Sequence, residues 1–520
     1  MTAAPTLLDV FHRSDASHDW ACTPAIHVPG PPTSVTLSYV QLHRQCARLA
    51  SQLQHGLQLE RGAVVTLVLP NGPLFVASFL ACAGLGWIAA PLNHAYNAEE
   101  VRFYVEDTRS SVVIVPAGWS AEGRPAVQAA RALGCRVLEL APIAAEDKGD
   151  GATLDTGAIW QAQPDDVALV LHTSGTTGRP KCVPLTHRNI RTTMDNVVRT
   201  YQLTRSDCTL IVMPLFHVHG LIASLLSTLQ SGGACAVPPR FSASAFWPHV
   251  QAFNVTWYSA VPTIHSILLR HTLPDPLPKL RFIRSASSSL APHTLKQLEE
   301  ALQAPVLEAY AMTEAAHQMC SNPLPPAVHK PGTVGPAQGV ELTVRDEQGR
   351  EVAVGEQGEV CVRGANVTAG YRDNPTANRD AFFPDGHWFR TGDRGKLDAD
   401  GYLSLTGRIK ELINRGGEKI SPIEVDAALL SCAGVKDAVS FAAPDELYGE
   451  VVHCAVVSDY VSDETDSGAA AEVERIRAHC AEKLSAFKVP ARVYLMRDIP
   501  KTATGKVQRR LVAAKVGTQA

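Results

Sequence analysis

A run of glycine and hydroxyl residues at positions 172–181 has the composition of a phosphate-binding loop. It directly follows Val167–His172, an apolar segment that we expect to form a buried strand. Exposed backbone N–H groups and hydroxyls can donate to a polyphosphate, and a lysine adds a positive charge. The candidate phosphate ligands in this run are Thr173, Ser174, Gly175, Thr176, Thr177, Gly178 and Lys181.

The run does not follow the pattern of a P-loop nucleotide-binding site. That pattern requires Gly-Lys followed by serine or threonine, with an earlier glycine at a fixed distance. Gly178 is followed by Arg-Pro-Lys, and the other candidate, Gly505-Lys506, has Val507 after it and Pro500 where the first glycine should stand. Kinase and P-loop ATPase functions are therefore disfavoured, and a flexible surface turn remains an alternative for the glycine run taken alone.

Further motifs follow the run at intervals along the chain, in the segments Tyr310–Glu314, Arg390–Asp393, Gly407–Ile413, Arg415–Ile420 and Pro500–Lys506. Together with the run at 172–181, and in this order, they resemble the adenylate-forming superfamily. That superfamily includes acyl-CoA synthetases, luciferases and the adenylation domains of peptide synthetases. A surface turn does not account for a set of motifs that extends from residue 172 to residue 506.

The resemblance implies ATP-dependent activation of a carboxylate, in which a carboxylate oxygen attacks the α-phosphorus and pyrophosphate leaves. Thr313 is then expected to donate to the α-phosphate, and Glu314 to hold Mg²⁺, a cation that prefers oxygen ligands. Lys506 is expected to reach across a domain cleft to the reacting groups as a mobile point charge. The resemblance also assigns ATP contacts to Ser287, Glu308, Ala309, Tyr310, Asp393 at the ribose hydroxyls, and Arg408 beside it.

The resemblance implies a second half-reaction in which the thiol of CoA attacks the adenylate. In the family the small domain rotates about a hinge residue, which corresponds to Lys410 here. The rotation is expected to bring Gly416, Gly417 and Glu418 towards the pantetheine, since glycines permit close backbone approach. ATP, Mg²⁺ and CoA are the expected small-molecule ligands.

The segments expected to line the acyl pocket are polar, although long fatty acids and aryl acids need an apolar pocket. The resemblance places His217 at the pocket mouth and suggests that it takes part in catalysis with Lys506, Thr313 and Glu314. Several hydrogen-bond donors around a small cavity suit the second carboxylate of a short diacid. The expected acyl contacts are His217, His219, Ser287, Ser288 and His317.

The segment Ala309–Met319, with Ser321–Pro325 after it, resembles the oxalate–CoA ligase group of this superfamily. This resemblance predicts conversion of oxalate, ATP and CoA to oxalyl-CoA, AMP and pyrophosphate. Malonyl-CoA synthetases share the His-x-His-Gly element at 217–220, so malonate or another short-chain acid remains the alternative. A luciferase-like oxygenase is disfavoured because its large aromatic substrate does not suit His219 and the serines at 285–289. A peptide-synthetase module is disfavoured because no carrier attachment motif follows the small domain.

The elements that must position these residues alternate between strand-like and helical segments. Apolar runs at Val167–His172, Thr209–Pro214 and Arg281–Ser285 alternate with helical stretches, which predicts an α/β fold with mainly parallel sheets. From about residue 409 the chain has short strands, an acidic loop and a charged helix at Glu472–Leu484. We therefore expect a large N-terminal domain at 1–408 that binds ATP and the acid. A small mobile α+β domain at 409–520 should carry the adenylation lysine.

Composition excludes several other classes of protein. The chain has 520 residues, a formal net charge of −4, 45% hydrophobic residues and 19% charged residues. These values allow large cores and disfavour disorder or a nucleic-acid partner. The twelve cysteines include no Cys-x-x-Cys pair, which argues against a zinc knot or a redox motif.

The apolar segment Phe75–Leu92 approaches membrane-spanning length, but glycines and prolines interrupt it. We expect a strand, a helix and a strand in a buried core and no membrane association. Met1–Arg13 lacks the features of a secretory signal, and the last residues do not form a Ser-Lys-Leu signal. A cytoplasmic monomer or homodimer is therefore expected.

Overall fold

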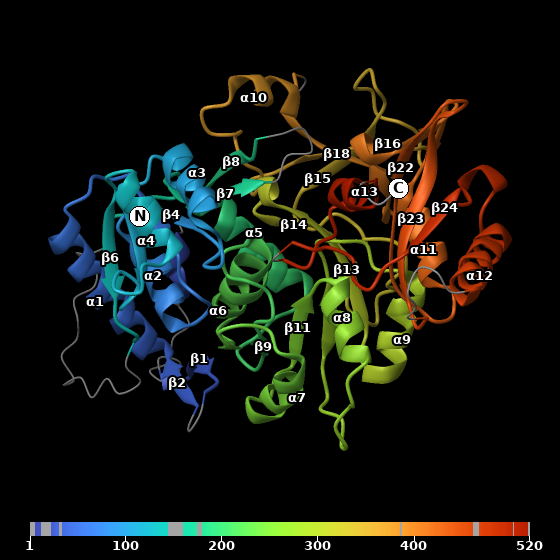
Figure 1. Ribbon diagram of the computed structural model, residues 1–520. Coiled ribbons are helices and arrows are strands. Elements are labelled where there is room, and N and C mark those ends of the chain that lie inside the picture. Colours follow the sequence, from blue (N-terminus) through green and yellow to red (C-terminus); the bar gives the residue numbers. More distant parts are fainter. Residues whose placement is uncertain are drawn as a thin grey trace.

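The protein is described here by a computed structural model, shown in Figure 1. The structure describes residues 6–11, 22–30, 34–143, 160–173, 179–384, 387–460, 467–502 and 504–517. These residues form three sheets and their helices in a large N-terminal domain, and a fourth sheet in a small C-terminal domain. The predicted α/β class and the division into a large and a small domain are confirmed.

The first sheet has six strands, parallel except at the edge where β8 is antiparallel to β7. Its order is β6 (Arg136–Leu140), β5 (Val112–Pro116), β3 (Val64–Leu67), β4 (Ile88–Pro91), β7 (Val167–Thr173) and β8 (Lys181–Thr186). The associated helices are α1 (Tyr39–Leu57), α2 (Pro73–Gly84), α3 (Ala98–Thr108) and α4 (Pro125–Ala132). The antiparallel β7–β8 pair holds the two ends of the glycine run side by side.

The apolar segment Phe75–Leu92 forms most of α2 and then β4, and the preceding strand is β3. Every residue of α2 from Phe75 to Gly84 is buried, because the helix is enclosed within the domain core. The predicted strand, helix and strand are thus present. Among the described helices, none is both long and apolar enough to cross a membrane.

The second sheet has eight strands, parallel from β13 to β1 and antiparallel at both edges. Its order is β14 (His317–Ser321), β13 (Val306–Met312), β12 (Phe282–Ser285), β11 (Trp257–Ala260), β9 (Cys208–Leu210), β10 (Ala234–Ala236), β1 (Pro24–Val28) and β2 (Val35–Ser38). Its helical segments are α5 (His187–Thr200), a π-helix (His219–Leu226), α6 (Ser227–Ser231), α7 (Ala243–Ala252), α8 (Pro262–Leu269) and α9 (Pro292–Leu302).

The strand expected at Thr209–Pro214 is shorter, because β9 ends at Leu210. Beyond it the side chain of Asn71 replaces a neighbouring strand as the hydrogen-bond partner. Its Oδ1 accepts from the N–H of Leu215 at 2.9 Å, and its Nδ2 donates to the carbonyl of Met213 at 3.3 Å. The chain therefore leaves the sheet early and enters the turn that presents His217.

The third sheet is antiparallel throughout, so the prediction of mainly parallel sheets holds for the first two sheets. It contains β15 (Glu341–Arg345), β16 (Gly358–Arg363), β17 (Phe382–Phe383), β18 (Trp388–Leu397) and β19 (Leu403–Arg408), and α10 (Pro375–Ala381) lies beside it. A short 3-10 helix (Ile409–Glu411) follows β19 and leads into the small domain.

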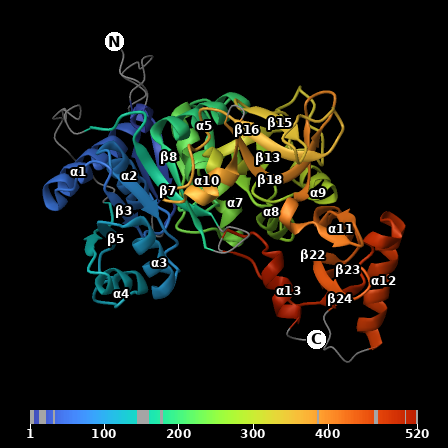
Figure 2. The same cartoon turned by 90° about the horizontal axis from the view of Figure 1, so that it is seen from above.

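The small domain is an α+β unit with its own apolar core, and it lies to one side of the large domain in Figure 2. Its strands are β20 (Ile413–Arg415), β21 (Glu418–Ile420), β22 (Val435–Asp445), β23 (Gly449–Ser458) and β24 (Arg492–Leu495). Its helices are α11 (Pro422–Leu430), α12 (Ser467–Lys483) and α13 (Arg509–Gly517). The helix expected at Glu472–Leu484 thus begins five residues earlier, at Ser467.

Candidate active site

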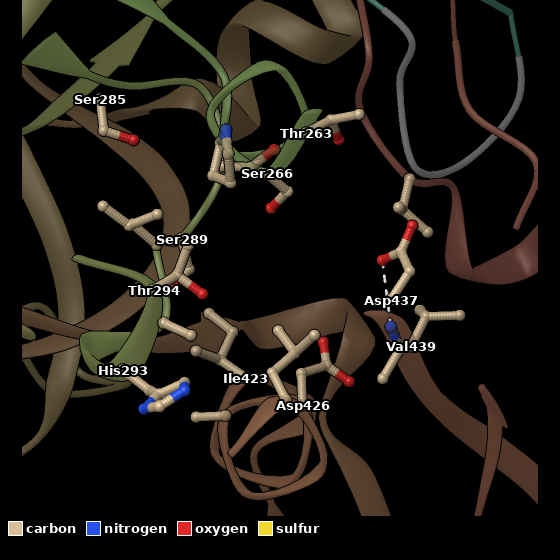
Figure 3. A pocket seen from close by; sticks show the side chains of 18 of the residues that line it. Thr263, Ser266, Ser285, Ser289, His293, Thr294, Ile423, Asp426, Asp437 and Val439 are labelled. Atoms are coloured by element: carbon tan, nitrogen blue, oxygen red, sulfur yellow. Dashed lines mark hydrogen bonds between the residues drawn. The ribbon is translucent and has the colours of Figure 1, made fainter. Parts of the chain in front are cut away.

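A cleft of about 1250 Å³ separates the two domains. Its large-domain wall comes from the loops that follow β11, β12 and β13, where the carboxyl ends of parallel strands meet. Figure 3 shows Thr263 and Ser289 on this wall, facing Ile423 and Asp437 of the small domain across the opening. Two contacts join the walls: Thr263 Oγ1 donates to the carbonyl of Gly505 at 3.1 Å, and Arg270 Nη2 donates to the carbonyl of Lys436 at 3.0 Å.

Asp393, predicted to bind the ribose, lies in β18 directly opposite Arg408 in β19. Arg408 Nε is 3.1 Å from Asp393 Oδ1, and the hydroxyl of Tyr310 donates to Oδ2 of the same carboxylate. Asp393 is buried and lines the cleft with Tyr310 and Arg408. The three predicted nucleotide contacts therefore form one cluster, in which a cation and a hydroxyl hold the Asp393 carboxylate in place.

Glu314, predicted to hold Mg²⁺, is buried in the short 3-10 helix Thr313–Ala315 that ends β13. The hydroxyl of Tyr371 donates to Glu314 Oε1 at 2.9 Å, and the ammonium of Lys181 lies 4.5 Å from the centre of the Tyr371 ring. Burial raises the pKa of Glu314, while Tyr371, Arg408 and Lys181 act in the opposite direction. Lys181, the predicted phosphate ligand, and Glu314, the predicted metal ligand, thus both contact Tyr371.

The ends of the glycine run are held by the β7–β8 pair, in which Thr173 lies directly opposite Lys181. The remaining predicted phosphate ligands, Ser174, Gly175, Thr176, Thr177 and Gly178, lie outside the described residues. Because Thr173 and Lys181 are neighbours and Lys181 lies beside Tyr371, the run begins and ends at the edge of the Glu314 site.

Lys506 lies on the wall of the cleft, next to the turn that carries Gly505. Desolvation between the two domains and the charge of Arg408 lower the pKa of Lys506, whereas Asp393, Glu411 and Glu314 raise it. The lysine is therefore within electrostatic range of both predicted nucleotide carboxylates, although it belongs to the small domain. That it reaches across the cleft to the reacting groups stays a prediction.

Glu308 and Ala309 belong to β13 and line the cleft. Glu308 is buried, and its Oε2 accepts a hydrogen bond from the N–H of Gly332 at 2.9 Å. Burial raises the pKa of Glu308 to about 8, and the Gly332 hydrogen bond lowers it only in part. Near neutral pH this carboxyl therefore carries a proton in a large fraction of molecules.

The predicted acyl contacts come together at the π-helix His219–Leu226, a kind of helix that is frequent at functional sites. His219 is fully buried; its Nδ1 is 3.0 Å from Ser287 Oγ and its Nε2 is 2.6 Å from Ser259 Oγ. The N–H of His219 donates to Nδ1 of His217 at 3.3 Å. Burial, followed by the charge of Lys506, lowers the pKa of His217 to about 4.

His317, on β14, completes this cluster from the other side, with its ring centre 5.1 Å from that of His219. Ser287 and Ser288 both line the cleft, and Ser287 connects the histidines to it. The backbone is strained at two residues of this cluster, with φ of 73° at Ser287 and 113° at His317. Residues in this region of φ are costly and concentrate at functional sites, so the fold holds these side chains in place against local preference.

Sequence reasoning assigned no role to Arg284, although it lies at the centre of the acyl cluster. Arg284 is fully buried in β12 and donates to Ser259 Oγ at 3.1 Å, beside His219. Its other partners are Tyr201, His317 and Gln318. The available signal was an arginine within the buried strand Phe282–Ser285, because arginine is almost never buried without a partner.

The predicted hinge and CoA residues lie apart from the cleft. Lys410 is exposed in the 3-10 helix after β19. Gly416 and Gly417 form the turn between β20 and β21, with φ of 59° and 99°, and Glu418 follows them as an exposed residue. None of these four residues is among those that line the cleft in the described part of the chain. Of the residues predicted for the first half-reaction, Asp393, Arg408 and Lys506 line the cleft, whereas Thr313, Glu314 and Lys181 are not among its lining residues.

Comparison with known proteins identifies the class of enzyme to which this fold belongs. Residues 16–372 match the family model described as AMP-binding enzyme, and residues 424–506 match that of the AMP-binding enzyme C-terminal domain. The chain belongs to the AMP-binding enzyme family.

Two curated relatives carry the same name. The chain is 49% identical to the oxalate–CoA ligase of Arabidopsis thaliana, over 92% of this chain and 93% of the relative. It is 42% identical to the oxalate–CoA ligase of Saccharomyces cerevisiae, over 99% of this chain and 98% of the relative. The fold matches the crystal structure of ATP-bound MatB from Rhodopseudomonas palustris with a TM-score of 0.85 and 28% identity, covering 98% and 99% of the two chains. The TM-score to apo MatB is 0.76, so the present structure is more similar to the ATP-bound form.

Proposed function

We propose that this protein is an AMP-forming oxalate–CoA ligase, which converts oxalate, ATP and CoA to oxalyl-CoA, AMP and pyrophosphate. The observation that carries the proposal is the acyl cluster, where Arg284, His219 and His317 are buried with no carboxylate ion-paired to Arg284 among the described residues. Such a cluster suits an anionic substrate group. The two relatives named oxalate–CoA ligase support the choice of acid.

In the first half-reaction an oxalate oxygen forms a bond to the α-phosphorus of ATP, and the bond to pyrophosphate breaks. Asp393 accepts from the ribose hydroxyls, and Thr313 donates to the α-phosphate. Lys506 contributes its charge between the attacking carboxylate and the α-phosphate, from a position near Asp393 and Glu314. Positioning and electrostatic stabilisation of this kind need no covalent bond to the protein.

Glu314 fits a magnesium ligand, because it is a buried carboxylate whose one side-chain hydrogen-bond partner among the described residues is the neutral hydroxyl of Tyr371. Magnesium neutralises charge on the phosphate oxygens when it is bound. Lys181 would hold the phosphates on the other side of Tyr371.

The choice of a short acid rests on the two relatives named oxalate–CoA ligase. We expect the first carboxylate of the substrate to lie near Lys506 and the second to face the cluster that contains Ser287 and His317. Oxalate is the diacid with the shortest spacing, since its two carboxylates are directly bonded.

The second half-reaction requires the small domain to move, because Gly416, Gly417 and Glu418 lie outside the cleft. We propose that the domains meet between residues 408 and 409 and that Lys410 is the hinge, since β19 ends at Arg408 and a short exposed turn follows. The CoA thiol then attacks the acyl carbonyl and AMP leaves. A cytoplasmic location agrees with twelve free cysteines, of which most are buried.

The test is a CoA-dependent AMP-release assay with oxalate, malonate, acetate, octanoate and 4-coumarate. We expect oxalate to give the highest kcat/KM, with acetate far lower because it lacks the second carboxylate. A preference for malonate would replace oxalate by the next longer diacid and contradict the choice of acid. A preference for octanoate or 4-coumarate would contradict the assignment of the histidine cluster to the acyl pocket.

A further inference from the structure

Arg284 is a buried cation whose hydrogen-bond partners among the described residues are all neutral. It donates from Nε to the hydroxyl of Tyr201 at 2.7 Å and from Nη2 to Gln318 Oε1 at 3.3 Å. It also donates to Ser259 Oγ at 3.1 Å and lies 3.4 Å from His317 Nδ1. Because an arginine side chain has only donors, it determines which atoms of these neighbours must act as acceptors.

The proton of His317 is placed by this rule. Arg284 Nη2 faces Nδ1 of His317, so Nδ1 accepts and the neutral ring carries its proton on Nε2. Nε2 of His317 is fully buried and has no hydrogen-bond partner among the described residues. His317 therefore holds a buried N–H donor that lacks an acceptor, which is an arrangement that proteins avoid unless a ligand supplies one.

The proton of His219 follows from the hydroxyl of Ser259. Ser259 Oγ accepts from Arg284 Nη1, and Nε2 of His219, at 2.6 Å, is the only acceptor within reach of its hydrogen among the described residues. Ser259 thus donates to Nε2, which leaves the proton of His219 on Nδ1, where it donates to Ser287 Oγ at 3.0 Å. The hydrogen of Ser287 is then free to point into the cleft that this residue lines.

We propose that Arg284 is a positioning residue that fixes the tautomers of His219 and His317, so that the acyl pocket presents hydrogen-bond donors alone to the second carboxylate of the substrate. The inference rests on the proposed function, because it names the acid's second carboxylate as the missing acceptor. Arg284 need not touch the substrate. It acts through Ser259 and His219 on one side and through His317 on the other.

The surroundings of both rings keep them neutral, as this arrangement requires. Burial first, and then the charge of Arg284, lower the pKa values of His219 and His317 well below the usual range for histidine. The other titratable groups that act on these two rings are further imidazoles, His217 on both and His265 on His219. Each neutral ring keeps one acceptor nitrogen. In His317 this nitrogen is Nδ1, which faces Arg284, and in His219 it is Nε2, which accepts from Ser259.

The first experiment compares two amides at position 317 in the full-length enzyme. The amide of glutamine can replace the N–H at Nε2, whereas asparagine reaches only as far as Nδ1. We expect His317→Gln to keep the KM for oxalate within about 3-fold, and His317→Asn to raise it more than about 10-fold, as for loss of a hydrogen bond to a charged group. The KM for ATP should stay unchanged in both. Equal KM values for oxalate in the two variants would overturn the assignment of the proton to Nε2.

The second experiment replaces the arginine itself. Arg284→Met should raise the KM for oxalate more than about 10-fold while the KM for ATP is unchanged. Arg281→Met is the matched control, because Arg281 lies just before the same strand but ion-pairs with Asp207. The control should leave the KM for oxalate unchanged.

A tautomer measurement separates positioning from a merely structural role. In enzyme labelled with ¹⁵N-histidine, the signals of His317, assigned by their loss in His317→Gln, should show a protonated Nε2 in the wild type. In Arg284→Met they should show a mixture of tautomers or a proton on Nδ1. An unchanged tautomer would overturn the inference while leaving the proposed function intact. Absence of oxalate turnover in the wild type would instead refute the proposed function.

Discussion

The two ends of the active site differ in the sign of their buried charge. At the nucleotide end three carboxylates are buried, Glu308, Glu314 and Asp393, and each has a donor partner. At the acyl end the buried groups are Arg284, His219 and His317, and no carboxylate of a described residue bonds to them. The carboxylates at the nucleotide end suit the ribose and the metal ion of the nucleotide, whereas the donors at the acyl end suit the carboxylate that does not react.

The largest effect should come from the nucleotide end. Lys506→Ala should reduce ATP–pyrophosphate exchange with oxalate by about 100-fold or more, because the charge near the α-phosphate is lost. Thioester formation from a supplied acyl-adenylate should continue, since the phosphorus has already reacted. Lys483→Ala, which removes an exposed lysine from α12 of the same domain, is the control and should change neither rate. Equal loss of both half-reactions would contradict the role of Lys506.

At the acyl end, His219→Phe should lower kcat/KM for oxalate by about 10- to 100-fold, since it removes a buried link between Ser259 and Ser287. The KM for ATP should not change. His249→Phe, at a partly buried histidine on α7, is the control. A parallel rise in the KM values for ATP and oxalate would show that the two ends are not separate.

The reciprocal change at the nucleotide end is Asp393→Asn. It weakens the partner of Arg408 and the expected ribose acceptor, so the KM for ATP should rise about 10-fold while the KM for oxalate stays constant. Asp398→Asn alters a partly exposed carboxylate that pairs with Lys330, and it should leave both KM values unchanged. If Asp393→Asn changed the KM for oxalate alone, the assignment of the ends would be reversed.

The smallest expected effect concerns stability at Glu308. Its pKa is raised to about 8 in the folded protein by burial, so folding favours the protonated acid. The stability that this proton contributes is present below the unfolded pKa, near 4.5, and is lost as the pH rises through about 8. Glu308→Gln, which can still accept from Gly332, should therefore be more stable than the wild type at pH 8.5, by about 1–2 kcal/mol, and similar to it at pH 5.

Urea unfolding at pH 5, 7 and 8.5 measures this difference. The gap between Glu308→Gln and the wild type should widen as the pH rises. A gap that is constant with pH would show that Glu308 remains ionised in the folded protein.

The sequence predicted the nucleotide end better than the acyl end, for a physical reason. Asp393 and Arg408 face each other across one antiparallel pair, and Lys506 follows a short motif, so local patterns contain most of their geometry. The acyl end combines β11, β12, β14 and the π-helix, and its network depends on contacts between residues far apart in sequence. His219, His317 and Ser287 could be predicted as polar residues on lining segments. The role of Arg284 could not, because an arginine in a buried run is a signal but only the fold shows what it faces.

Fold class and domain order followed from periodicity and motifs, but two local features did not. β9 ends at Leu210, and beyond it Met213 and Leu215 bond to the side chain of Asn71, which is distant in sequence. The antiparallel third sheet was not predicted, because the apolar runs that indicated strands all lie in the first two sheets.

The π-helix at His219–Leu226 also bears on how the choice of acid could change during evolution. A π-helix has more residues in each turn than an α-helix, in which each residue rotates the chain by about 100°. Deleting one residue from this segment would restore the narrower turn and rotate His219 away from Ser259, while the following helix kept its packing. Deletion of a single codon could thus disconnect His219 from Ser259 and Arg284 in one step, without any new loop. A pocket for a dianion would then become available to an uncharged acyl chain.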